Sequence, residues 1–104
     1  MRRSDIIGVL DATGVGFTTG SQTVTDTAAL IPTTNMPNRK AITIFNMSSV
    51  NTIYIGNSGV TSANGFPITP KQGLPFDLGS GSAMYAVCET GKTAEARILQ
   101  VDNG

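Results

Sequence analysis

Any chemistry done by this chain must proceed without histidine, because the sequence contains none. Histidine is the commonest general base in enzymes and the commonest metal ligand in proteins. Ser-His-Asp and Cys-His arrangements are therefore excluded within the chain. The single cysteine, Cys88, lies in the alternating segment 83–89 and shares a face with Met84 and Ala86. This pattern is typical of a small buried residue and predicts an unreactive thiol. A lone cysteine also forms no internal disulfide, which suits a reducing compartment.

Seven carboxylates are the remaining residues that could perform acid–base chemistry or bind a metal. A glycosidase needs two carboxyl groups held about 5–10 Å apart, whereas those of this chain are scattered and several fall in turns. They are Asp5, Asp11, Asp26, Asp77, Glu89, Glu95 and Asp102. No spacing matches a calcium loop or a cysteine cluster, and the glycines at 14–16 and 79–81 lack the context of a phosphate loop. We therefore predict no enzyme, no metal and no cofactor.

The composition indicates one folded β domain. The 104 residues amount to a single domain, of which 39% are apolar and 13% charged. Disordered chains are usually richer in charge, and the many Thr and β-branched residues favour pleated strands. Seven basic and seven acidic residues give a net charge of zero, which argues against nucleic acid as a partner. Since no run of about 18 apolar residues is present, we expect no membrane span.

Period-two alternation of apolar and polar residues predicts the strands. Four segments show it most clearly: residues 41–46, 51–55, 83–89 and 93–101. We expect the first two to form an antiparallel pair, connected by residues 47–50, and the last two to form a hairpin that turns at residues 89–92. The sequence 66–70 contains two prolines, which restrict it to an edge or to one end of the domain.

The same alternation assigns side chains to faces. We expect a buried face that includes Ile42, Ile44, Ile53, Ile55, Met84, Ala86 and Ile98. Glu95 and Arg97 alternate with that face and should meet solvent or a partner. Many short strands separated by turns are typical of a sandwich or barrel. We therefore predict an all-β fold made of two antiparallel sheets.

An ordered series of motifs runs through the central and C-terminal parts of the chain. It consists of KAITIFN at 40–46, IYIGNSGVT at 53–61, NGFPI at 64–68, MYAV at 84–87 and ARIL at 96–99. This series resembles a group of small β proteins encoded among the virion genes of tailed bacteriophages, over roughly residues 39–101. The resemblance implies a virion structural component, often a capsid decoration (cement) protein. It also implies a jelly-roll-like sandwich, to which we add an extended N-terminal arm at residues 1–12.

The functional expectation that follows is a protein that binds the outside of the phage head and stabilises the shell. It would be made in the host bacterial cytoplasm. Its partners would be the major capsid protein and itself, as a homotrimer or alternatively a homodimer. Related domains occur in tail and fibre proteins, so a tail or receptor-binding module is the main alternative. Six per cent aromatic residues without tryptophan weaken a carbohydrate-binding role. The third function class is an unrelated enzyme or a nucleic-acid-binding barrel. Such a barrel would need aromatic platforms with a basic groove, and neither is visible in the sequence.

The N-terminal segment supplies the candidate interface residues. It begins like a signal peptide, but its apolar stretch is too short, so we expect it in the mature protein. Residues 6–10 are either an arm that reaches a neighbouring subunit or a first core strand. The candidate capsid or oligomer contacts are Arg2, Arg3, Ile6, Ile7, Val9 and Leu10. Arg2 and Arg3 form one basic pair, and Arg39 and Lys40 form the other. We expect each pair either to be solvated or to contact an acidic protein surface.

One short motif would place the protein in a different setting. Asn46-Met47-Ser48 matches the acceptor pattern for N-glycosylation. The pattern is short enough to arise by chance, and nothing else in the sequence indicates secretion by a eukaryotic route.

Overall fold

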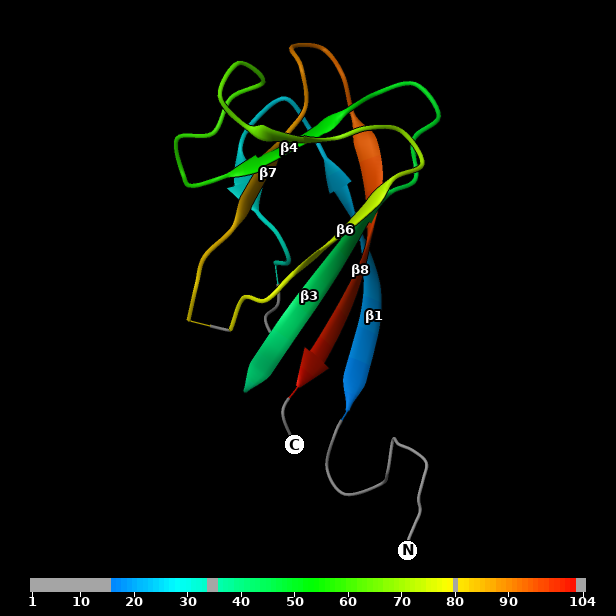
Figure 1. The fold of residues 1–104 in the computed structure, drawn as a ribbon. Coiled ribbons are helices and arrows are strands. Elements are labelled where there is room, and N and C mark those ends of the chain that lie inside the picture. The colour runs from blue at the N-terminus through cyan, green and yellow to red at the C-terminus, as the bar shows by residue number, and fades with distance from the viewer. Residues whose placement is uncertain (1–15, 34–35, 80, 103–104) are drawn as a thin grey trace, which may run out of the picture.

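The computed structural model describes residues 16–33, 36–79 and 81–102, and within them it is all-β, with no helix (Figure 1). The predicted arm at residues 1–12 lies outside this part of the chain. The strands are β1 (Phe17–Val24), β2 (Ala29–Leu30), β3 (Arg39–Asn46), β4 (Ile53–Gly56), β5 (Phe66–Ile68), β6 (Gly73–Phe76), β7 (Tyr85–Val87) and β8 (Ala94–Asp102).

The strands form two four-stranded antiparallel sheets, which confirms the predicted two-sheet sandwich. The first sheet has the order β1-β8-β3-β6 and the second has the order β2-β7-β4-β5. Figure 1 shows that the long strands β1, β8 and β3 continue past the short strands of the second sheet. One end of the first sheet is therefore left without a partner sheet.

The core lies between the inner faces of the two sheets and consists mainly of isoleucine and alanine. All seven side chains predicted to be buried are buried, with Ile44 and Ile53 fully enclosed. Along β8, buried Ala94, Ala96 and Ile98 alternate with exposed residues. A strand with this period can rest one face on a core while the other meets solvent or a partner.

Both predicted hairpins are wrong. Strand β3 pairs with β8 and β6, whereas β4 pairs with β7 and β5, so residues 47–52 cross from one sheet to the other. The turn after β7 does form, with the Lys92 amide donating to the Glu89 carbonyl at 2.9 Å, but it too crosses between sheets. Alternation shows which face of a strand is buried, and both sheets of a sandwich bury faces against the same core. It therefore does not reveal which strands pair.

The proline-containing segment lies at an edge, as predicted. Strand β5 is the last strand of the second sheet, and its Pro67 stands opposite Tyr54 of β4. Proline lacks the amide hydrogen that a central strand would donate, so an edge is where it can be accommodated. Strand β6, which contains Pro75, is likewise the last strand of the first sheet.

Candidate functional site

The six interface residues proposed from the sequence all precede residue 16. Arg2, Arg3, Ile6, Ile7, Val9 and Leu10 therefore lie outside the described residues. The described part offers a different surface, which consists of the free edge and the outer face of the first sheet.

The groups that could perform chemistry are dispersed or buried. No cluster of three or more histidine, cysteine, aspartate or glutamate residues that could hold a metal occurs in the described ranges. Cys88 is buried, and its thiol lies 3.5 Å from the carbonyl oxygen of Val24. Burial raises the pKa of the Cys88 thiol, and the negative charges of Asp26 and Glu89 raise it further. The thiolate is the reactive form of cysteine, so this environment disfavours a nucleophile.

No helix in the part of the chain that the structure describes is long and apolar enough to cross a membrane.

Strand β1 is an edge strand that pairs with β8 and has no second neighbour in its sheet. Its eight residues, FTTGSQTV, include no charge and no proline, and its register with β8 runs without a bulge. Edge strands are usually protected by charges, prolines or bulges, because an open row of backbone groups attracts other strands. β1 has none of these three features. The β1 edge is therefore suited to pairing with a further strand.

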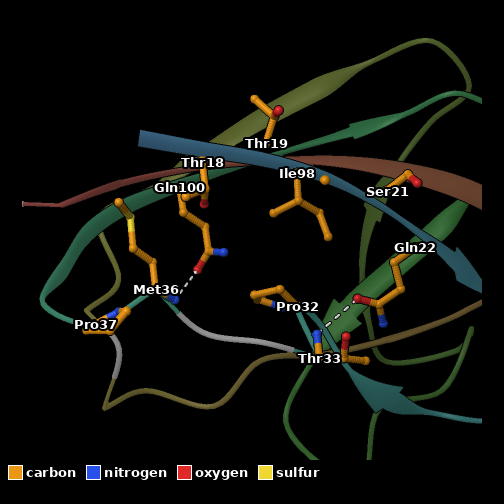
Figure 2. A pocket seen from close by; sticks show the side chains of 11 residues that line it. Thr18, Thr19, Ser21, Gln22, Pro32, Thr33, Met36, Pro37, Ile98 and Gln100 are labelled. Atoms are coloured by element: carbon orange, nitrogen blue, oxygen red, sulfur yellow. Dashed lines mark hydrogen bonds between the residues drawn. The ribbon is translucent and has the colours of Figure 1, made fainter. Parts of the chain in front are cut away.

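Two hollows flank β1, one on each face of the sheet. The first opens on the inner side, between the sheet and residues 32–33 and 36–37, and holds about 430 Å³ (Figure 2). The second lies on the outer face and holds about 470 Å³. Both include Thr19, Gly20 and Ser21. Because a cavity of about 150 Å³ accepts a benzene molecule, each hollow has room for a large apolar side chain.

Two glutamines hold the far wall of the inner hollow. The Gln22 side chain donates to the Leu30 carbonyl at 2.7 Å and accepts from the Thr33 amide at 3.1 Å. The Gln100 side-chain oxygen accepts from the Met36 amide at 3.0 Å. Figure 2 shows Ile98 pointing into the space between these two glutamines, toward Pro32. The hollow thus has an apolar centre between fixed polar supports.

Arg39 lies beside Gln100 at the inner hollow. The prediction that Arg39 is a solvated charge is wrong. The residue is only 4% exposed, whereas Lys40 is exposed. Its guanidinium donates to the carbonyls of Leu78 and Gly79 at 2.9 and 2.8 Å, and to Gln100 at 3.1 Å. Burial lowers the pKa of Arg39, yet arginine remains protonated in proteins. The charge therefore fastens the loop after β6 to the sheet.

The outer face of the first sheet is apolar near its free end. Phe17 is 64% exposed and stands opposite Val101, and Leu99 stands between Thr19 and Thr43. Phe45 borders the outer hollow.

Charge is balanced at the margin of that face, where Arg97 pairs with Glu95 at 3.0 Å. Both side chains are about half exposed, which confirms the face predicted for them. The surface is consequently neutral and suits contacts by shape and apolar burial.

Sequence reasoning missed this surface, because residues 14–28 alternate only weakly. The signal that was available is the eight-residue run from Phe17 to Val24, which lacks any charge or proline.

A comparison with known protein families and with curated proteins found no match. The resemblance to phage virion proteins therefore rests on the ordered motifs alone.

Proposed function

We propose that this protein is a phage capsid decoration (cement) protein, which binds the outer surface of the head and stabilises the shell. The observation that carries the proposal is the neutral, partly apolar outer face of the first sheet together with the open edge of β1. Exposed apolar patches and unprotected edges mark interaction surfaces in folded proteins. No described residue packs over this surface, so it is available to be buried by a binding partner.

The pairing of the strands supports the proposal. Four of the pairs are β1–β8, β2–β7, β3–β6 and β4–β5, in which the strand numbers always sum to nine. We infer that this is the winding of a jelly roll, in which eight strands form two Greek keys. Viral capsid proteins and lectins use that architecture, and it agrees with the motif resemblance.

The partners under this proposal are the major capsid protein and further copies of the chain. A homotrimer at threefold positions is favoured over a homodimer, because a symmetric shell offers repeated sites for a closed ring. Stabilisation would follow from mass action, since a ligand that binds only the assembled shell adds about 2.7 kcal/mol per site at a hundredfold excess over Kd. With a net charge of zero, binding should depend little on salt.

A tail or receptor-binding module is the second candidate. Phe66 is 59% exposed on the edge strand of the second sheet, and Leu30 is 42% exposed on the opposite edge strand of that sheet. Exposed aromatic and apolar side chains away from β1 are what contact with a host receptor would require.

The experiment is the return of purified protein to undecorated heads of the phage that encodes it. We expect the full chain to bind and to raise the temperature at which the heads open. Phe17→Asp should lose this protection, whereas Val50→Asp, at an exposed apolar residue on a loop between the sheets, should retain it. Absence of protection by the unaltered protein would contradict the cement function.

A further inference from the structure

We propose that residues 6–10 of a second copy of this chain bind as an added strand along the free edge of β1. The proposal rests on the function proposed above, because it names the occupant of part of the same surface. It makes the protein an oligomer held together by exchanged N-terminal segments.

The hydrogen-bonding groups along this edge follow from the register of β1 with β8. The Asp102 amide donates to the Gly16 carbonyl at 2.9 Å, and Phe17 stands opposite Val101. In an antiparallel ladder this makes Phe17 a residue whose own amide and carbonyl point away from β8. The same holds at every second residue, hence at Thr19 and Ser21. The edge therefore presents a regular row of donors and acceptors, for which the described residues supply no partner.

The two hollows define the side chains that the added strand must carry. They lie on opposite faces of the sheet and meet at Thr19–Ser21. Because successive side chains of a strand point to opposite faces, an added strand would direct neighbouring residues into different hollows. Ile98 and Pro32 line the hollow on the inner side, and Leu99 and Phe45 line the hollow on the outer side. The occupant must therefore be apolar on both faces.

Residues 6–10 have this composition. In an extended chain Ile6 and Leu10 share one face, while Ile7 and Val9 share the other, and no residue from 6 to 10 is charged. β1 itself has mostly Thr, Ser, Gly and Gln between Phe17 and Val24, so pairing of β1 with β1 of another copy would instead bring mainly polar residues toward the hollows. The hydrogen bonds of such a pairing would form, but the apolar walls would stay uncovered. Strand addition of this kind draws affinity from the backbone and specificity from alternate pockets.

The length of the connecting chain allows the exchange. Five residues lie between Leu10 and Gly16, and six extended steps span about 20 Å. Each copy presents both the start of its N-terminal segment and a free edge at β1, so neighbouring copies can give and receive segments in a closed ring.

Sedimentation equilibrium on the full chain tests the proposal. We expect concentration-dependent association that is weakened about a hundredfold by Ser21→Pro, which removes an outward amide without touching the ladder to β8. Ser62→Pro is the matched control, since Ser62 occupies a turn closed by the Asn64 amide on the Thr61 carbonyl. It should associate like the unaltered chain.

A second variant keeps the test decisive if Ser21→Pro fails to fold, as circular dichroism would show. The double variant Ile7→Lys/Val9→Lys changes the donated segment and leaves β1 intact. It should lose association to the same extent. A monomeric unaltered protein, or a folded variant of either kind that associates normally, would overturn the proposal.

The outcomes also separate this proposal from the cement function. A protein that protects heads from heat but is monomeric, or associates regardless of these variants, overturns the exchange of segments alone. A protein that associates as expected but gives no protection overturns the cement function alone.

Discussion

The side-chain amide of Asn46 donates a 2.8 Å hydrogen bond to the carbonyl oxygen of Ile68, which joins the end of β3 to the edge strand of the opposite sheet. The same amide donates to the Asn51 carbonyl at 2.8 Å, and its oxygen accepts from the Ser48 amide at 2.9 Å. Asn46 is fully buried. One side chain thus fixes the corner at which the chain leaves the first sheet for the second.

Asn46→Ala should therefore lower the free energy of unfolding by about 3 kcal/mol, because buried carbonyls and an amide lose their partner. Urea denaturation measures this change. Asn57→Ala is the control, since its side chain serves only the exposed Gly59 amide. Equal losses in the two variants would show that the corner does not depend on Asn46.

Ile44 lies at the centre of the core and is fully enclosed. Ile44→Ala should cost about 2–5 kcal/mol by leaving a cavity between the sheets. Val50→Ala, at a side chain 77% exposed, should change stability by less than about 0.5 kcal/mol. A small loss at Ile44 would mean that the inner face of β3 has been assigned to the wrong side.

Gly65 allows the loop between β4 and β5 to close over the second sheet. A Cβ atom at this position would lie 2.6 Å from the Tyr54 Cβ and 2.8 Å from a methyl carbon of Val60. Gly65→Ala should lower stability by about 1–3 kcal/mol. At Gly81 an added Cβ meets nothing within 4 Å, so Gly81→Ala should change stability little. Thermal melts of both variants would detect the difference, and similar melting temperatures would refute the close contact.

Cys88 should make the protein less stable in alkali. Its folded-state pKa is raised above the ordinary value of 9.0 by burial, and by Asp26 and Glu89. Below that pH both states keep the proton, so stability is unaffected. As pH rises from 9, the unfolded chain loses the proton first and stability falls, until the folded pKa is passed.

Urea midpoints between pH 8 and pH 10 measure this effect. The pKa of Tyr54 is also raised from its ordinary value of 10.0, by burial and the Glu89 hydrogen bond, so the effect of Tyr54 on stability grows mainly above this range. Cys88→Ala should flatten the decline. An equally steep decline in that variant would show that another group is responsible.

How far the sequence predicts this fold is clearest in β8. Ala94, Ala96 and Ile98 alternate with Glu95 and Arg97, and a period of two is enough to place each on its face. The hairpins failed because Ile42 and Ile53 face the same core from opposite sheets. Their strand partners depend on contacts distant in sequence, which local patterns do not encode.

Two polar residues mark a second limit of sequence reasoning. Asn46 begins a glycosylation pattern, yet its buried amide is already engaged in the corner and is closed to a glycan in the folded protein. Arg39 begins a basic pair, yet it is buried, and it donates hydrogen bonds to carbonyls of the loop after β6. In both cases most of the partners are backbone groups, and these leave no trace in residue types.

The edge of β1 shows which part of the candidate surface could be predicted from the sequence. An uncharged run such as Phe17–Val24 signals a strand without protection against pairing. That β1 lies at an edge, and that two hollows meet at Gly20, depends on the path of the whole chain.

The copy number of the protein in purified particles of the encoding phage tests the central claim most directly. Quantitative mass spectrometry would measure the ratio of this chain to the major capsid protein. A decoration protein occupies repeated positions over the shell, so we predict on the order of hundreds of copies per particle, in a fixed ratio to the capsid protein. A handful of copies would contradict decoration and favour a tail component, and absence from the particle would contradict any virion role.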